Sequence, residues 1–551
     1  MSAGACEAAG TGHCRESRFN EGGRDMRLLS AAHIAALCSM ALAQTLTAIP
    51  GTQAGETYGL SFSTYLGGSG GEDTARAVAV DAEGNIFVAG GTRSADFPTT
   101  PGAYSRAYDA GGHSVGARGP MDVFVTKLDP QGRIVWSTLL GGPNYDRAYT
   151  VRVDKQGFVY VGGRAGEGFP TTPDTVQPQF EGDSGGPGAY GRQDGFLVKL
   201  SPDGSRVLWS TYFGTPCGAI IRDFDIDGEG NVFLVMIEVK EPCRHVTRGA
   251  FQERMPGPPN SVVAKVSADG RRVLWCAYLG GADRDLAPSI RVGPDGQPAV
   301  AGSTFSSDFP ATGGAFQRQL RGKQDAFVAK LAADGSRLLY ATLLGGSDED
   351  GAEGKHGLAL DRAGRAYVLG FTSSPDFPTT PGAFQRRYAG AATGSWRETG
   401  DRFVAILSAD GSRLEAATLL GGSARDGGEG IAVDAAGRIY LGGMTFSRDF
   451  PVTDSAYQSR YGGAARPHGP LWGGGDATVV VFSPDLHRAL FSTYLGGSGE
   501  DLFRACALTP GGELVLVGST TSKDWPTKNA IQSSPAGGPD EVIVAKFRPC
   551  D

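Results

Sequence analysis

The sequence predicts an all-β protein: a seven-bladed β-propeller of four-stranded antiparallel blades, closed by an amino-terminal strand that completes the last blade. Three observations predict this fold. A short phrase ending in two glycines recurs seven times, each period holds four short apolar runs, and the two ends of the chain complement each other. A fixed period marks a repeat architecture, and four antiparallel strands per period favour a propeller.

The repeated phrase is Tyr-Leu-Gly-Gly or a close variant, and its first glycines are separated by 65 to 76 residues. These glycines are Gly67, Gly141, Gly214, Gly280, Gly345, Gly421 and Gly496. The third unit departs from the phrase, because Thr215 stands where the other units have a second glycine.

The four apolar runs of the first unit are expected to form strands. They span residues 77–80, 86–89, 123–125 and 134–136. Each run is rich in β-branched and aromatic residues and too short for a helix. Turns that contain Asp, Pro and Gly join the first run to the second and the third to the fourth, which indicates tight hairpins. Only the second-to-third connection is long, and it contains Asp96-Phe97-Pro98.

The chain ends predict how the ring closes. Residues 60–66 form a fourth strand without a blade of its own, and the last unit stops after its third strand, residues 542–546. We therefore expect a propeller over residues 56–551. Closure removes the open sheet edges that invite aggregation. The alternative is a linear β-solenoid, which would not need complementary ends.

Three strings carry a resemblance to a known family. They are Ser-Thr-Tyr-Leu-Gly-Gly at residues 63–68, Asp-Ala-Phe-Val-Ala-Lys-Leu at residues 325–331, and Asp-Phe-Pro-Thr-Thr-Pro-Gly-Ala-Phe-Gln at residues 376–385. In combination they resemble the SBBP family of bacterial β-propeller repeats, over about residues 56–551. The resemblance implies a propeller and an exported or cell-surface location, as for most members, and it implies no particular activity.

Composition and charge narrow the range of partners. The 85 glycines and 32 prolines fall largely at turns, as a hairpin-dense fold requires, and the net charge is −8. No cluster of basic residues in the sequence forms the footprint that nucleic-acid binding needs. A mildly acidic surface chiefly supports solubility.

The amino terminus predicts export. Residues 26–43 combine the charge of Arg27, an apolar run and the small-x-small cleavage pattern Ala41-Leu42-Ala43. Residues 1–25 are polar and are expected to be a non-native or disordered upstream extension. The mature chain would be secreted, periplasmic or on the cell surface, with no membrane insertion. The alternative is a retained anchor, although its apolar run is short for a bilayer span of about 20 residues.

Five cysteines remain after the predicted signal segment, an odd number for an exported protein. Cys217 and Cys243 flank the first two strands of the deviant third unit. We predict that they form a disulfide that staples this blade, and two buried free thiols are the alternative. Cys276 occupies an ordinary strand position.

The candidate ligand-binding residues lie in inserts on one face of the ring. All length variation falls in the connections on the side of the Gly-Gly turns, and long variable loops on a rigid scaffold are where binding usually occurs. The aromatic and histidine residues of these inserts are Tyr190, Trp396, Trp472, His113 and His468. An exposed aromatic ring could stack on a sugar or grip a peptide, or it could fold back on the blades as a local plug.

A carboxylate recurs after the Gly-Gly turn, just before each innermost strand except that of the third unit. These mouth aspartates are Asp73, Asp146, Asp285, Asp350, Asp426 and Asp501. Carboxylates around a channel mouth could hold a hard cation such as Ca²⁺. Alternatively, each aspartate caps its own turn by accepting backbone N–H groups.

No catalytic residue is predicted, since no histidine recurs with the repeat and no phosphate-binding motif is present. The sequence favours an exported, non-enzymatic, monomeric propeller that binds a glycan, a peptide or a cell-surface partner through the variable loops. It needs no cofactor beyond the Ca²⁺ considered above. One alternative is a secreted carbohydrate-active hydrolase or lyase that uses acids at the channel mouth. Another is a structural module of a cell envelope.

Overall fold

A computed structural model describes residues 57–112, 116–182, 189–215, 219–240, 242–352, 354–390, 400–463 and 475–550. Strands β1 to β29 lie in these residues, which contain no α-helix. Within this part of the chain no helix is long and apolar enough to cross a membrane. The predicted signal segment, residues 26–43, and the predicted extension, residues 1–25, lie outside the described residues.

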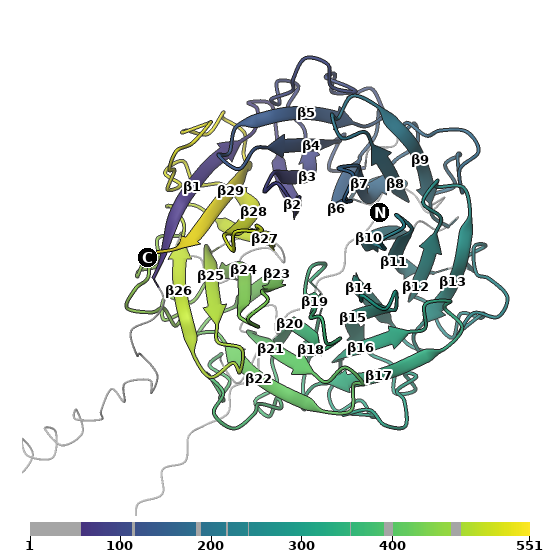
Figure 1. Cartoon of the computed structure of the whole chain (residues 1–551), viewed down its shortest axis with the longest axis vertical. Helices are drawn as coiled ribbons and strands as arrows, with labels where there is room; N and C mark the ends of the chain where they lie inside the picture. Colours follow the sequence, from purple (N-terminus) through teal and green to yellow (C-terminus); the bar gives the residue numbers. More distant parts are fainter. Residues whose placement is uncertain are drawn as a thin grey trace, which may run out of the picture. The chain divides into compact units, whose positions relative to one another are not determined.

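Seven antiparallel sheets follow one another along the chain and form the seven blades of a ring (Figure 1). Blade 1 consists of β2 (Asp73–Val80), β3 (Ile86–Thr92), β4 (Asp122–Leu128) and β5 (Ile134–Leu140). Blade 2 consists of β6 (Arg147–Val153), β7 (Val159–Ala165), β8 (Asp194–Leu200) and β9 (Val207–Phe213). Blade 3 consists of β10 (Ile220–Ile226), β11 (Val232–Val239), β12 (Asn260–Val266) and β13 (Val273–Leu279). Blade 4 consists of β14 (Asp285–Val292), β15 (Pro298–Thr304), β16 (Asp325–Leu331) and β17 (Leu338–Leu344).

The remaining blades include the ring closure. Blade 5 consists of β18 (Asp350–Gly351), β19 (Leu358–Leu360), β20 (Ala366–Thr372), β21 (Asp401–Leu407) and β22 (Leu414–Leu420). Blade 6 consists of β23 (Asp426–Val433), β24 (Ile439–Thr445), β25 (Asp476–Phe482) and β26 (Ala489–Leu495). Blade 7 consists of β27 (Asp501–Leu508), β28 (Leu514–Thr520), β29 (Glu541–Pro549) and β1 (Tyr58–Leu66). The predicted seven-bladed propeller is therefore confirmed.

The amino-terminal strand closes the ring as predicted. β1 pairs antiparallel with β29, in a register that runs from Tyr58 opposite Pro549 to Leu66 opposite Val542. Side chains add to the closure: Trp525 Nε1 donates a hydrogen bond to Ser63 Oγ at 2.9 Å. The first and last parts of the chain thus share one four-stranded sheet.

Apolar side chains fill the space between neighbouring blades, and outer-strand tryptophans connect several of them. Trp136 of blade 1 donates from Nε1 to the carbonyl of Pro202 in blade 2 at 3.0 Å. Its ring lies over Gly204, where a Cβ would come within 2.6 Å of the indole. Gly204 also has a positive φ of 68°, so the turn requires glycine for both reasons. Trp209 and Trp275 repeat the contact with the following blades.

Blade 5 departs from the expected four-strand pattern. Its innermost strand is interrupted between β18 and β19. In Figure 1 the chain between these two strands extends towards the middle of the ring. This excursion positions residues in the central channel.

Candidate functional site

The six mouth aspartates are buried at the start of the innermost strands. In every case one carboxylate oxygen accepts a hydrogen bond from the second residue of the Gly-Gly turn, at 2.7–2.8 Å. In five blades a serine hydroxyl also donates to the same oxygen. This geometry is that of a turn cap.

A shared cation at the mouth aspartates stays a prediction. Among the described residues no group of three His, Cys, Asp or Glu side chains is arranged to hold a metal ion. Each mouth aspartate accepts a hydrogen bond from its own turn, and Asp285 also accepts one from Asn260 of the preceding blade at 3.4 Å.

A second set of carboxylates, which the sequence analysis missed, lies beside the first. It occupies the first position of the third strand in five blades. Its members are Asp122, Asp194, Asp325, Asp401 and Asp476. In blade 5, a Cβ at Gly421 would lie 2.6 Å from Asp401 Oδ1 and 2.7 Å from Asp426 Oδ2. The first glycine of the Gly-Gly turn is therefore glycine because the backbone passes between two carboxylates.

Burial, and next the charge of Asp426, raise the pKa of Asp401 to about 8. Burial raises the pKa of Asp426 to about 6, although the Arg402 guanidinium and three hydrogen-bond donors oppose the shift. The charge of Asp426 therefore disfavours ionisation of Asp401, because a nearby like charge disfavours the charged form of a carboxyl group.

Of the predicted ligand-binding residues, Tyr190 is the one the structure describes. Trp396, Trp472, His113 and His468 lie outside the described residues. Tyr190 is half-buried and its ring lies 4.3 Å from the guanidinium carbon of Arg164 and 5.5 Å from that of Arg147. The variable connection of blade 2 therefore brings an aromatic ring to arginines at the channel mouth.

The innermost strands share an irregularity that lines the channel. In six of them one extra residue forms a β-bulge against the second strand. The polar bulge residues, from five blades, are Arg76, Tyr149, Arg222, Glu429 and Arg504. Bulges commonly re-aim a side chain next to functional sites. Here they bring polar side chains from five blades into one buried cluster.

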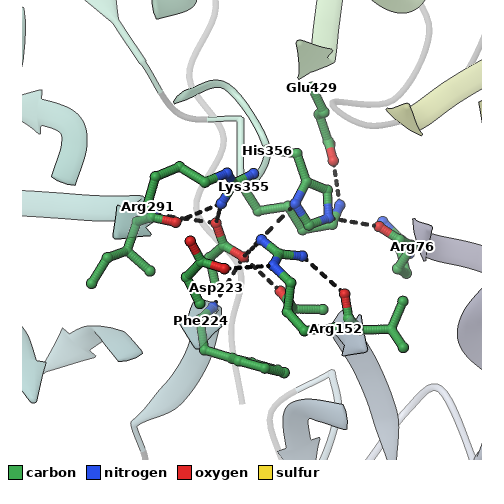
Figure 2. A network of polar contacts seen from close by, with 12 residues as sticks. Arg76, Arg152, Asp223, Phe224, Arg291, Lys355, His356 and Glu429 are labelled. Carbon is green, nitrogen blue, oxygen red and sulfur yellow. Dashed lines mark hydrogen bonds and ion pairs between the residues drawn. The ribbon is translucent and has the colours of Figure 1, made fainter. Parts of the chain in front are cut away.

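Residues from the blade 5 excursion cross the channel and contact several blades (Figure 2). Lys355 pairs with Glu429 of blade 6, and Arg504 of blade 7 pairs with the same carboxylate at 3.0 Å. His356 donates from Nε2 to the carbonyl of Arg76 in blade 1 at 3.1 Å. Burial, followed by the nearby Lys355 charge, holds the pKa of His356 well below its usual range, so the imidazole is neutral.

Asp223 anchors the blade 3 side of this network (Figure 2). Its buried carboxylate pairs with Arg291 at 2.6 Å and with Arg152 at 3.4 Å, and it also accepts from the hydroxyl of Thr150 at 2.9 Å. These contacts link blades 2, 3 and 4. A buried carboxylate with this many donors is satisfied structurally, so Asp223 ties blades 2, 3 and 4 together beside the channel.

A pocket opens at the channel mouth between blades 5, 6 and 7. Its walls are largely apolar, with Phe371, Met444 and Leu502, and Glu429 and Arg504 supply charge. An apolar pocket with a few converging polar groups is the usual form of a small-ligand site. It lies on the face of the Gly-Gly turns, because Asp426 and Gly427 at the start of β23 also line it.

Cys243 and Cys276 are both buried. Cys217 lies outside the described residues, so the predicted Cys217–Cys243 disulfide stays a prediction. Cys276 is a strand residue of β13, as expected.

These features define a class of protein: a β-propeller whose channel contains a buried charged network and whose variable loops share one face with a mouth pocket. Residues 62–98 and 135–170 match the model of the SBBP beta-propeller repeat. The seven blades and this match together show that the chain carries repeats of the SBBP family.

A curated relative and several solved structures are also similar to this chain. The regulatory protein FlaEY of Caulobacter vibrioides is 25% identical over 461 residues, which cover 76% of this chain and 45% of that protein. The chain thus spans less than half the length of that relative.

Among solved structures, BamB from Moraxella catarrhalis is 10% identical with a TM-score of 0.34, covering 89% of this chain and 99% of BamB. The polysaccharide lyase Uly1 is 10% identical with a TM-score of 0.41, covering 92% of this chain and 95% of the lyase. With TM-scores this low, neither likeness carries an argument about function.

Proposed function

We propose that the protein is an exported, non-enzymatic β-propeller that binds a glycan, a peptide or a cell-surface partner. The binding surface is the face with the Gly-Gly turns and the long connections. The observation that carries this proposal is the mouth pocket, where Phe371, Met444 and Leu502 meet the charges of Glu429 and Arg504. Tyr190, which lies on the same face over Arg164, supports the proposal.

The geometry favours binding over the hydrolase or lyase alternative. Glycoside hydrolysis uses two carboxyl groups that are free to exchange protons with the substrate. Each mouth aspartate is instead buried and accepts hydrogen bonds from its own turn. Those bonds would have to break before such an acid could act.

Export is part of the proposal and is supported by the sequence of residues 26–43. Expressed in a bacterium, the chain is expected to leave the cytoplasm with Gln44 at or near its new amino terminus. Amino-terminal sequencing of the exported protein would identify that residue.

A glycan and peptide array tests the binding function. The purified protein should bind at least one member, and Gly427→Leu should abolish that signal by filling the pocket. A side chain at Gly427 first meets the terminal methyl group of Met444 at 2.8 Å, which can move, so the fold should be preserved. Gly228→Leu is the matched control, because a Cβ there meets no atom within 4 Å and the turn lies on the opposite face.

Three results would count against the proposal. An array without any signal would contradict it. If the Gly427→Leu variant bound the ligand as well as the wild type, the binding site would lie outside the pocket. Turnover of a bound glycan, abolished by substitution of a single mouth aspartate, would support the enzymatic alternative instead.

A further inference from the structure

Three arginines surround one buried tyrosine at the channel mouth of blades 2 and 3. The guanidinium carbons of Arg147, Arg164 and Arg222 lie 5.0, 5.4 and 4.8 Å from the ring centroid of Tyr149. Arg147 also donates to the Tyr149 hydroxyl at 2.7 Å. The three arginines come from β6, β7 and β10, so the fold itself gathers them.

Two of these arginines form a like-charge pair on adjacent strands. Arg147 of β6 lies directly opposite Arg164 of β7. The corresponding pairs in other blades are uncharged: Thr74 with Gly91, Leu286 with Ser303, Gly427 with Met444 and Leu502 with Ser519. Like charges directly opposite each other destabilise a sheet. The Arg147–Arg164 pair therefore destabilises blade 2, and the repeat does not need such a pair for folding.

Two members of this cluster, Arg147 and Arg164, and the nearby Arg76 have no carboxylate partner among the described residues. Arg147 is only 4% exposed, and the Nε atoms of Arg147, Arg164 and Arg76 are buried without a hydrogen-bond partner. Within the described residues none of these three guanidinium groups forms an ion pair with a carboxylate. Burial of an unpaired charge is unfavourable, and a guanidinium pairs best with an oxyanion that it can bind through two N–H groups.

The titration of Tyr149 reflects the same surplus of charge. Burial opposes ionisation of its phenol, but the charges of Arg147, Arg164 and Arg222 outweigh burial and hold the pKa of Tyr149 well below its usual range.

We propose that this arginine cluster is an oxyanion site that binds a carboxylate or sulfate group of an acidic glycan. The proposal rests on the proposed binding function, and it adds a second contact for the ligand on the same face as the mouth pocket. A glycan fits better than an acidic peptide because the half-buried ring of Tyr190 lies 4.3 Å from the guanidinium carbon of Arg164. The fully buried Tyr145 packs against this ring at 5.0 Å between centroids, and an aromatic face such as that of Tyr190 can stack on a sugar ring.

Thermal unfolding in the presence of defined anions tests this site. The probes are tetragalacturonate, tetraglutamate and sodium sulfate, each compared with sodium chloride at equal ionic strength. Tetragalacturonate should raise the Tm of the purified protein, because a ligand that binds the folded state stabilises it. In Arg164→Gln its Kd should weaken by roughly tenfold or more, the usual loss for a charged hydrogen bond. Arg164→Lys keeps the positive charge but cannot bind an oxyanion through two N–H groups of one guanidinium. Its Kd for tetragalacturonate should therefore lie between those of the wild type and Arg164→Gln.

The controls separate binding from folding. In chloride alone, Arg164→Gln should unfold at the wild-type temperature or above it, because it removes one member of a like-charge pair. Arg413→Gln, at an exposed ion pair with Glu415, should respond to tetragalacturonate as the wild type does.

Four outcomes would overturn the proposal. The first two are no rise in Tm with tetragalacturonate and an equal rise in the Arg164→Gln variant. The third is a rise in Tm with sulfate alone, which would indicate a site for small ions. The fourth is a rise with tetraglutamate alone, which would indicate that the ligand is an acidic peptide. If the protein bound a neutral glycan on the array and the Arg164→Gln variant bound it equally well, the proposed binding function would stand. Only the oxyanion site would then be contradicted.

Discussion

At the scale of single residues, paired carboxylates control the Gly-Gly turns and make stability depend on pH. Asp401 in blade 5 is fully buried beside Asp426. Its pKa in the folded protein is raised to about 8, above the value of roughly 3.9 in an unfolded chain. The folded state therefore holds this proton more tightly. The corresponding stabilisation is fully present below about pH 4 and is lost as the pH rises through 8.

Asp401→Asn should flatten this pH dependence. Blade 3 has Asn260 at the same position, the start of its third strand, so the amide fits the site. We expect the wild-type Tm to fall between pH 5 and pH 8 and the variant to lose much of that fall. At pH 8 the variant should be more stable by on the order of 1–3 kcal/mol. Calorimetry across this range measures the effect.

Asp410→Asn provides the control for this comparison. Hydrogen bonds from Ser408 and Ser412 lower the pKa of Asp410 to about 2, so its titration lies outside the window. Parallel Tm curves for Asp401→Asn and the wild type between pH 5 and pH 8 would show that the buried pair does not titrate there.

At the scale of elements, the sequence predicted the strands, turns and mouth aspartates, because each recurs as the same residue type in the same place. The channel residues did not show this signal. The bulge position holds arginine, tyrosine or glutamate in different blades, so only the position recurs, three residues after Asp73, Asp426 and Asp501. The length of the innermost segment does reveal the blade 5 excursion. From the mouth aspartate to the aspartate of the first hairpin the chain advances 8 positions in blade 1, Asp73 to Asp81, but 11 positions in blade 5, Asp350 to Asp361.

The contacts made by the excursion between β18 and β19 should be essential for the stability of the folded ring. Glu429→Gln would leave Lys355 and Arg504 buried without their shared carboxylate. Breaking a buried ion pair from one side typically costs about 3–5 kcal/mol, so we expect a marked fall in Tm. Adding Lys355→Met to Glu429→Gln should restore part of the loss, because the two residues are coupled.

The matched control for Glu429→Gln is Glu415→Gln. Glu415 pairs with two arginines at the surface, Arg365 and Arg413, and surface ion pairs contribute only about 0–1 kcal/mol. Similar Tm values for Glu429→Gln and Glu415→Gln would mean that the channel network does not hold the blades together.

At the scale of the whole molecule, two devices hold the ring together. One is the channel network, in which residues of the blade 5 excursion bind Glu429 in blade 6 and Arg76 in blade 1. The other is the seam between β1 and β29. The seam joins the ends of the described chain, so opening it would expose two strand edges at once. The stability of the ring therefore depends on a junction of two strands.

A covalent link across this seam should stabilise the ring. A Cβ at Gly59 in β1 would lie 3.0 Å from Cys550 Sγ, close to the separation of about 3 Å that an S–S bond imposes between these atoms. Oxidised Gly59→Cys should therefore form a disulfide and unfold at a higher temperature, by about 2–4 kcal/mol in free energy. A reductant should return its Tm to that of Gly59→Ser, which cannot form the bond. A disulfide that forms, by mass spectrometry, without raising the Tm would show that unfolding does not begin at the seam.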